Sequence, residues 1–349
     1  YCTVEYGSGV LLILGNPLIN QSTIRYHSSS GIKTESYNSS NSTVTLKITN
    51  NTISNNTTSD SGGGLKWYGQ VIVLISGNTI SENTGSGGGG MKVDGGTITI
   101  SGNTIENNKS GRYQDTWPSG TEFRVDEEGG GILTQSGTIQ ISNNIIKGNQ
   151  ARSGGGIAGK GTVTGNTITG NTATEKGGGI YVDYGGNTIS DNYILNNTGG
   201  SIYVRSSYLP ITGNIIEGAL YYYHGGYSKN DVGKVTGNMI YNGGLTLIGE
   251  RLRESVYDDQ GNSSEVYYVG LEVKNNTING GVSIKGSVVF NNNNVWTLST
   301  QNALGTDDLN AENNYWGTSD ASVIATKVYD WNDDSSLGFV DYTPHETAM

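Results

Sequence analysis

The unit Gly-Asn-Thr-Ile recurs along most of this 349-residue chain, and its spacing limits the folds that the chain can adopt. Most copies start about 21 to 27 residues apart, a period typical of solenoids, in which each repeat packs only against its neighbours. The first asparagines of the units are Asn51, Asn78, Asn103, Asn144, Asn166, Asn187, Asn214, Asn238 and Asn276. We therefore predict a solenoid in which each repeat forms one coil.

Apolar residues keep three fixed positions relative to these asparagines. One position lies three residues before the asparagine, as at Ile100, and one lies two residues after it, as at Ile105 and Ile189. The third directly follows a run of glycines, as at Met91. Each position alternates with polar neighbours, which indicates short strands with one buried face. Three such strands per repeat predict an all-β, parallel β-helix of roughly eleven coils.

The asparagine of each unit falls at a bend between two strands. It usually follows Gly or another Asn, residue types that tolerate the positive φ angle such a bend requires. Because parallel strands stack about 4.8 Å apart, asparagines at one position in consecutive coils can hydrogen-bond to each other, as amide ladders do in cross-β stacks. A second ladder is predicted five residues later, at Asn56, Asn83, Asn108, Asn149, Asn171 and Asn192.

Composition supports one elongated domain and narrows the range of partners. Glycine supplies 55 residues and charged residues only 15% of the chain, as expected for strands and turns with little helix. The net charge of −11 disfavours binding to nucleic acid or to an anionic membrane surface. No apolar run is long enough to span a bilayer, so we expect no membrane insertion.

Two insertions interrupt the regular coils, and loops on a rigid scaffold often carry function. The first, residues 111–128, lengthens one repeat to about 41 residues and is rich in charged and aromatic side chains. The second, residues 250–268, has alternating residues on both sides of a turn sequence at 259–262, which predicts a protruding hairpin. We expect both insertions to flank the sheet formed by the strands that follow the glycine runs.

The outward face of that sheet is the predicted binding surface. Its residues combine tyrosines with charged groups, include Leu133 and Ala158, and continue into Tyr221-Tyr222-Tyr223-His224. Aromatic rings can stack on sugars while polar groups fix their orientation, so this face favours carbohydrate. A tyrosine ladder that only stabilises the exterior of the solenoid is the other interpretation. The predicted ligand-binding residues are Lys92, Asp94, Lys160, Tyr181, Asp183, Tyr203, Arg205 and Tyr221.

The three histidines give no indication of a catalytic or metal site. His27, His224 and His345 are too scattered to suggest metal ligands or a nucleophile with its base. We expect all three to lie at the surface.

The repeat columns and the asparagine ladder resemble the pectate-lyase-like superfold of polysaccharide enzymes, which use this sheet face as their cleft. The resemblance implies one alternative function, a Ca²⁺-dependent lyase acting on uronic-acid polymers. Such an enzyme needs carboxylates to hold calcium and an Arg or Lys to abstract a ring proton. Residues of these types are Asp94, Asp126, Glu127 and Asp183, and Lys92, Arg124 and Arg205. The catalytic motifs of that family are not recognisable here, so we assign no catalytic residue and require no cofactor; calcium enters only with the lyase alternative.

The end of the chain carries the most specific resemblance. Residues 313–318, Asn-Asn-Tyr-Trp-Gly-Thr, together with 328–334 and a strand through Val340, are similar to the closing segment of right-handed parallel β-helix repeat proteins of bacterial and archaeal surfaces. We expect Trp316 to plug the last coil and residues 321–327 to form a short helix across its open end. The predicted domains are the coils of residues 1–300 and the last coil with its C-terminal cap, 301–349.

This second resemblance implies display at a surface, adhesion or contact with glycans. We predict a secreted or cell-surface, non-enzymatic β-helix that binds a polysaccharide or a cell-surface glycan, as an adhesin does. Residues 1–6 already read as a strand inside a coil, so we expect a processed chain or a fragment that lacks its N-terminal cap. The second alternative is therefore a structural subunit that self-associates end to end into an extracellular filament.

Overall fold

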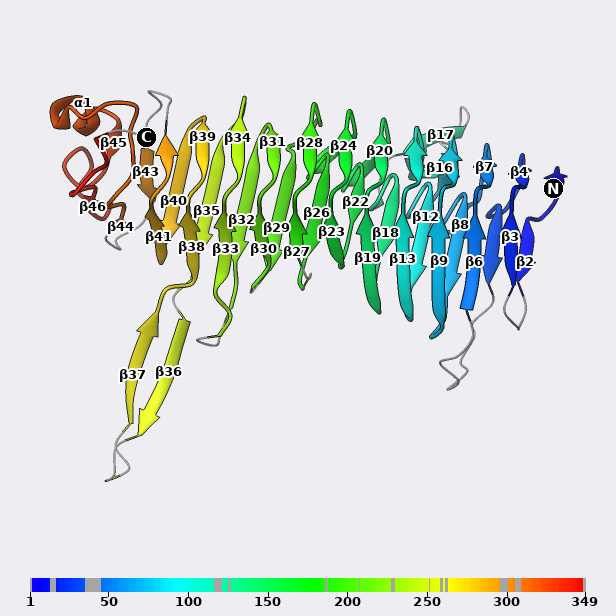
Figure 1. Ribbon diagram of the computed structural model, residues 1–349, viewed down its shortest axis with the longest axis horizontal. Coiled ribbons are helices and arrows are strands. Elements are labelled where there is room, and N and C mark those ends of the chain that lie inside the picture. Colours follow the sequence, from blue (N-terminus) through cyan, green and yellow to red (C-terminus); the bar gives the residue numbers. More distant parts are fainter. Residues whose placement is uncertain are drawn as a thin grey trace. The chain divides into compact units, whose positions relative to one another are not determined.

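The computed structural model describes residues 2–12, 17–34, 45–115, 121–124, 127–185, 188–206, 208–226, 230–250, 252–257, 260, 263–295, 301–304 and 309–347. The chain divides into two compact units, Tyr1–Val182 with Asp191–Ile202 and Asp183–Ser190 with Tyr203–Met349, which we call unit 1 and unit 2. In each unit, successive turns of the chain add short strands to three parallel sheets, A, B and C (Figure 1).

Unit 1 contains the first strands of all three sheets. Sheet A comprises β1 (Thr3–Glu5), β4 (Thr23–Arg25), β7 (Thr52–Ser54), β10 (Thr79–Ser81), β14 (Thr104–Glu106), β20 (Ile145–Lys147), β24 (Thr167–Thr169) and β28 (Tyr193–Leu195). Sheet B comprises β2 (Val10–Leu12), β5 (Ile32–Thr34), β8 (Leu65–Tyr68), β12 (Met91–Asp94), β18 (Ile132–Thr134), β22 (Ile157–Ala158) and β26 (Ile180–Asp183). Sheet C comprises β3 (Leu18–Asn20), β6 (Thr45–Thr49), β9 (Ile72–Ser76), β13 (Thr97–Ser101), β19 (Thr138–Ser142) and β23 (Thr162–Thr164).

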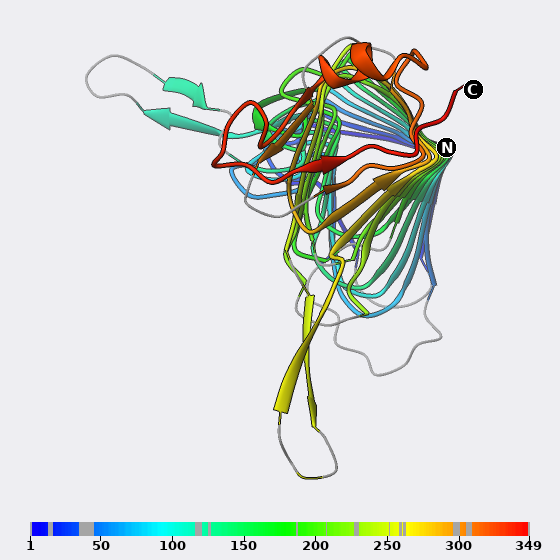
Figure 2. The same ribbon diagram turned by 90° about the vertical axis from the view of Figure 1, so that its left-hand side faces the viewer.

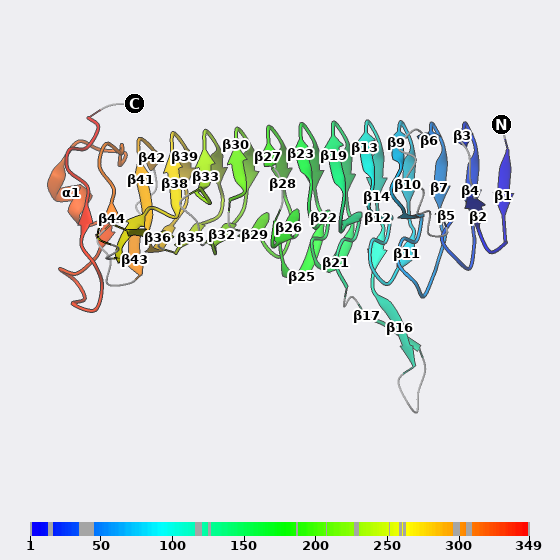
Figure 3. The same ribbon diagram turned by 90° about the horizontal axis from the view of Figure 1, so that it is seen from below.

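Two further elements belong to unit 1. A short parallel sheet is formed by β11 (Thr84–Gly85), β15 (Lys109–Ser110), β21 (Gln150–Ser153) and β25 (Thr172–Lys176). The first insertion folds as an antiparallel hairpin of β16 (Arg112–Asp115) and β17 (Thr121–Arg124). Figure 3 shows this hairpin projecting away from the coils of its unit. Asp126, named above as a candidate calcium ligand, lies outside the described residues.

Unit 2 repeats the same three-sheet construction. Sheet A comprises β31 (Ile215–Glu217), β34 (Met239–Tyr241), β39 (Thr277–Asn279) and β42 (Asn294–Val295). Sheet B comprises β29 (Ile202–Ser206), β32 (Leu220–His224), β35 (Leu245–Gly249), β40 (Val282–Gly286), β43 (Gln301–Leu304) and β45 (Val328–Tyr329). Sheet C comprises β27 (Thr188–Ser190), β30 (Pro210–Thr212), β33 (Gly233–Thr236), β38 (Leu271–Lys274), β41 (Val288–Asn291), β44 (Leu309–Asn310) and β46 (Val340–Asp341).

The second insertion and the end of the chain complete unit 2. The insertion forms the predicted antiparallel hairpin, β36 (Leu252–Tyr257) with β37 (Ser263–Tyr268), which extends far beyond the coils of its unit (Figure 2). The short helix α1 (Ala321–Ala325) begins after Asp320, whose carboxylate accepts hydrogen bonds from two backbone N–H groups. Trp316 is only 1% exposed, in keeping with the predicted plug of the last coil.

Buried asparagine ladders follow the bends of the coils in both units. Asn78 shows the repeating pattern, because its backbone N and its Nδ2 both donate to Asn103 Oδ1 at 2.9 Å. The same Nδ2 also donates to the carbonyl of Ile48 at 2.8 Å. The ladders are Asn51, Asn78, Asn103, Asn144, Asn166 and Asn192, then Asn56, Asn83, Asn108, Asn149, Asn171 and Asn197 in unit 1, and Asn214, Asn238, Asn276, Asn293 and Asn314 in unit 2.

The register of one repeat differs from the prediction. Asn166 N donates to Asn192 Oδ1 at 2.9 Å, so Asn192 belongs to the first ladder and not to the second. Ile189 accordingly pairs with Ile211 in sheet C, whereas we predicted it in the sheet A column. The sequence around Asn187, which itself lies outside the described residues, matches the repeat unit, but the buried positions before and after Asn192 decide the register.

The glycine runs before sheet B have two separate functions. Gly62 adopts a φ of 73°, a left-handed conformation that glycine takes without steric cost. Gly63 allows neighbouring coils to approach closely, because a Cβ atom there would lie 2.5 Å from the carbonyl oxygen of Gly89. A side chain at either position would therefore disturb the entry into the sheet.

His27 is buried, contrary to the expected surface position. Its backbone N donates to Asn56 Oδ1 at 3.1 Å, so it occupies a ladder position in an earlier coil. Its Nδ1 accepts from the backbone N of Gly7 at 3.1 Å and of Gly9 at 3.2 Å. The imidazole thus replaces the asparagine amide at this bend.

Candidate functional site

The outward face of sheet B carries the residues that the sequence singled out. In unit 1, Lys66 pairs with Lys92 and Tyr68 pairs with Asp94 in the register of β8 and β12. Further along the same row the surface changes, because Leu133 is only 7% exposed and Ala158 is fully buried. The predicted outward row is therefore not a continuous open surface.

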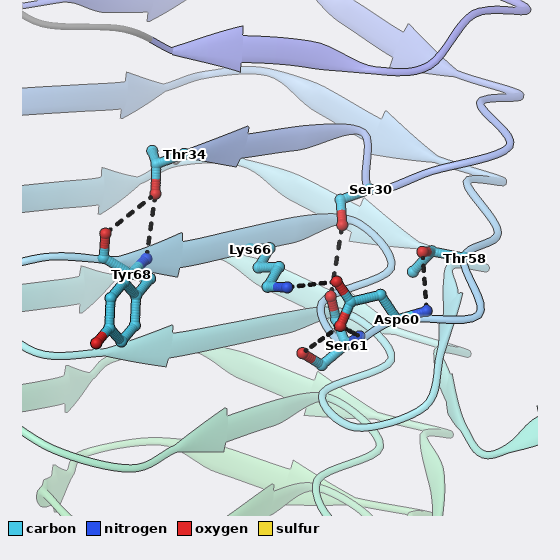
Figure 4. A network of polar contacts seen from close by, with 7 residues as sticks. All are labelled: Ser30, Thr34, Thr58, Asp60, Ser61, Lys66 and Tyr68. Atoms are coloured by element: carbon cyan, nitrogen blue, oxygen red, sulfur yellow. Dashed lines mark hydrogen bonds and ion pairs between the residues drawn. The ribbon is translucent and has the colours of Figure 1, made fainter. Parts of the chain in front are cut away.

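Lys92 and Asp94 line a depression in unit 1. Its volume is about 360 Å³, and its other lining residues are Thr34, Asp60, Ser61, Lys66, Trp67 and Tyr68. The Lys66 ammonium donates to the Asp60 carboxylate, and the Thr34 hydroxyl accepts from Tyr68 N at 3.1 Å (Figure 4). Burial raises the pKa of Asp60, but hydrogen bonds from Lys66 and the backbone of Ser61 outweigh it and hold that pKa below its ordinary value. Several polar groups here are thus already engaged with one another.

Two other predicted residues of unit 1 do not join this depression. Lys160 is exposed, but it is not among the lining residues. Tyr181 is only 8% exposed, so its ring offers little surface for a ligand. We therefore correct the prediction for Tyr181.

In unit 2, three predicted residues come together. Tyr203, Arg205 and Tyr221 line a depression of about 540 Å³. Alternate residues of β29 and β32 point outward, which places these side chains on one face. The remaining lining residues are Tyr184, Gly185, Ser206, Tyr223, Gly225, Asp231 and Glu250.

We predicted that the run of tyrosines on β32 continues the outward face. The structure instead divides this run between the two faces of the sheet. Tyr222 and His224 are fully buried because strand alternation sends every second residue inward. The Tyr222 hydroxyl donates to Leu209 O and accepts from Leu209 N, both at 2.9 Å. Burial raises the pKa of Tyr222 strongly, although the hydrogen bond from Leu209 opposes the shift. Tyr222 is therefore a core residue.

Arg205 is fixed by a carboxylate and by an aromatic ring. Its Nε and Nη2 donate to the two carboxylate oxygens of Asp183 at 2.5 and 2.7 Å, a bidentate pair. The Arg205 Cζ also lies 4.2 Å from the ring centroid of Tyr184, within the range of a cation–π interaction. Tyr184 has a φ of 61°, unusual for so bulky a residue, and its N–H donates to Arg205 O at 2.7 Å. The guanidinium is therefore held in place.

Tyr203 and Tyr221 stack on each other. Their ring centroids are 4.6 Å apart and their planes differ by 1°, which confirms a tyrosine ladder at this position. Rings this close leave no space for a sugar between them, so a ligand can contact only the outer faces and the edges. On the next strand Tyr221 is paired with Thr246, whose side chain is smaller than an aromatic ring, and Tyr221 is partly exposed. Burial, and then the proximity of Tyr203, raises the pKa of Tyr221.

Two buried polar groups on β29 and β32 have no partner among the described residues. The hydroxyl of Ser206, a residue only 3% exposed, has no hydrogen-bond partner among the described residues. His224 Nε2 contacts Asp231 O, while its Nδ1 likewise has no partner within the described ranges. The Tyr223 hydroxyl donates to the Glu250 carboxylate. Strand alternation places the Ser206 side chain on the inward face of β29 with Ile202 and Val204, so its hydroxyl does not face the depression.

Several residues of this depression were not predicted. Glu250 is the first residue of the second insertion, so its place at an interruption of the coils could have marked it as a candidate site residue. Ser206 is the last residue of β29, whereas Tyr184 and Asp231 lie between strands, and no repeat pattern in the sequence marks these three positions.

The described residues contain neither a metal-binding cluster nor a membrane-spanning helix. Among the described residues, no three His, Cys, Asp or Glu side chains gather where they could hold a metal ion. No helix in the described part of the chain has the length and apolar character to cross a membrane.

Family comparison agrees with this architecture. The model of the right-handed β-helix region matches residues 1–172 and 113–252, which together span more than half of the chain. The chain belongs to the right-handed β-helix family. Membership confirms the predicted fold class and the resemblance to β-helix repeat proteins. Neither a curated protein nor a solved structure matches this β-helix chain.

Proposed function

We propose that this right-handed β-helix protein binds carbohydrate in the unit 2 depression, as a non-enzymatic, adhesin-like protein that is secreted or displayed at the cell surface. One observation supports the proposal above the others. The depression joins a partly exposed tyrosine ring at Tyr221, a fixed ion pair at Arg205 and a carboxylate at Glu250. Aromatic area with a few well-placed polar groups is the chemistry that sugars require.

The geometry suggests how a sugar would bind. The apolar face of a pyranose would lie against the outer ring face of Tyr221. Sugar hydroxyls would then hydrogen-bond to the Glu250 carboxylate and to the Tyr223 hydroxyl, which already donates to Glu250. Because parallel strands form a rigid base, little conformational entropy would be lost on binding.

The lyase alternative is less well supported. It assigned Asp183 to calcium and Arg205 to proton abstraction, but these two residues bind each other through both carboxylate oxygens. A guanidinium in a bidentate pair is a poor proton acceptor, since the carboxylate stabilises its charged form. The lyase reaction therefore enters as an outcome of the test below.

Retention on a panel of neutral and acidic polysaccharides, with Ca²⁺ or with a chelator, tests the proposal. The absorbance of unsaturated uronates is followed in the same samples. We expect retention without new absorbance, and a loss of roughly tenfold in affinity for Tyr221→Ala, the size expected for an aromatic anchor. Tyr193→Ala is the matched control, because Tyr193 is 52% exposed on sheet A.

Each other outcome has a definite meaning. A calcium-dependent rise in absorbance would establish the lyase. Absence of retention on every polymer would overturn carbohydrate binding, and elution as polymers would then favour the filament subunit. Antibody labelling of intact cells tests the surface location separately.

A further inference from the structure

The charge of the unit 2 depression narrows the class of ligand. Its described lining includes the carboxylates of Asp231 and Glu250. The one cationic side chain in that described lining is Arg205, and Asp183 neutralises it through two hydrogen bonds. Glu250 thus places a carboxylate beside the tyrosines of the described lining, and a carboxylate attracts a cationic group and repels an acidic one.

We propose that the depression selects a glycan with free, protonated amino groups, such as a polymer of β-linked glucosamine. The inference rests on the proposed function and gives it a substrate class. It joins the carboxylate of Glu250 and the rings of Tyr221 and Tyr223 in one recognition site.

Glu250 is positioned to accept from an ammonium group. Its carboxylate already accepts from the Tyr223 hydroxyl, and its backbone N donates to His224 O at 3.4 Å. Both contacts fix the side chain at the rim of the depression. An ammonium donates three hydrogen bonds, and a bond to an ionised carboxylate is roughly twice as strong as one between neutral groups.

The aromatic walls favour an organic cation over a metal ion. Tyr184, Tyr203, Tyr221 and Tyr223 all line the depression. An ammonium group near a tyrosine face is attracted by the ring quadrupole. Calcium needs six to eight oxygen ligands, and Glu250 already shares its carboxylate with a tyrosine hydroxyl.

The test compares two hexamers that differ only in charge. Binding of β-linked glucosamine hexamer and of its fully N-acetylated form is measured by titration calorimetry at mildly acidic pH and low salt. We expect the amine to bind roughly tenfold more tightly or better, as for a charge-assisted hydrogen bond. Glu250→Gln keeps an acceptor for Tyr223 and should abolish the preference. Glu272→Gln removes the same charge from sheet C, outside the lining, and should preserve it.

The outcomes separate this inference from the proposed function. Equal binding of both hexamers, weakened by Tyr221→Ala, would overturn the amine preference and leave carbohydrate binding intact. Binding of neither hexamer, together with retention on another polysaccharide, would overturn the amine class alone. Loss of retention on all polymers would overturn both proposals. Equal or tighter binding of a lysine-rich peptide would replace the amino sugar by a cationic peptide.

Discussion

Asn103 provides a direct test of the asparagine ladder, because it is 1% exposed and both accepts and donates along the stack. Its Oδ1 accepts from Asn78 N and Nδ2, both at 2.9 Å. Its Nδ2 donates to Ile75 O at 2.9 Å and to Asn144 Oδ1 at 3.0 Å. Asn103→Ala therefore breaks contacts with the coils on both sides.

The expected cost follows from which groups lose their last partner. Asn78 Nδ2 keeps bonds to Ile48 O and Ser76 O, and Asn144 Oδ1 keeps the backbone N of Asn103. The buried Asn78 N–H loses the Oδ1 acceptor and becomes unpaired, which costs about 1–3 kcal/mol. The three other lost bonds named above contribute about 1 kcal/mol each, so we expect destabilisation of about 4–6 kcal/mol.

Urea unfolding monitored by circular dichroism measures this change through the transition midpoint and slope. Asn143→Gly is the matched control, since Asn143 precedes the ladder residue Asn144, is exposed and has a φ of 55° that glycine accepts without strain. It should alter the free energy of unfolding by less than about 0.5 kcal/mol. If Asn103→Ala were no more destabilising than this control, the ladder would not be a main source of stability.

Three further perturbations test other parts of the molecule. Tyr222→Phe should destabilise the protein by about 1–3 kcal/mol in urea unfolding, because it leaves the buried Leu209 N–H without its acceptor. Trp316→Ala should cost about 3–5 kcal/mol, measured in the same assay, since it empties a buried position in the last coil. The pKa of Asp60 is lowered in the folded state. The stabilisation that this carboxylate gives to the folded protein is therefore present above its unfolded pKa and is lost as the pH falls through its folded pKa. The free energy of unfolding, measured as a function of pH, should therefore be higher for the wild type than for Lys66→Met near neutral pH. The difference should disappear in strong acid, and a pH-independent difference would contradict the ion pair.

The fold was largely predictable because its signals are local and repeated. The isoleucine positions on both sides of Asn78 and Asn103 define inward strand faces, and the structure pairs those residues in register. The same local signal failed at Asn187, where the repeat unit was present but Asn192 entered the first ladder. The sequence there is compatible with either Asn187 or Asn192 in the first ladder. Only the buried neighbours on adjacent coils distinguish these two registers.

The candidate site was predicted only in part. Tyr203, Arg205 and Tyr221 were found from strand alternation on sheet B, and all three line the unit 2 depression. Tyr181 was on the same predicted face but is nearly buried, because exposure depends on the segments that cover a strand. The proximity of Ser206 and Glu250 could not be read from the sequence, since they belong to different coils.

The sequence by itself determined the solenoid, its three strands per coil and the inward positions, because each depends on residues only a few positions apart. Tertiary structure decided the ladder register at Asn192, the bidentate pairing of Arg205 with Asp183 and the location of the depression. These features arise between coils, where residues 22 or 26 positions apart meet across stacked strands. Period and alternation specify how one coil is built, but contacts between particular side chains depend on how neighbouring coils align.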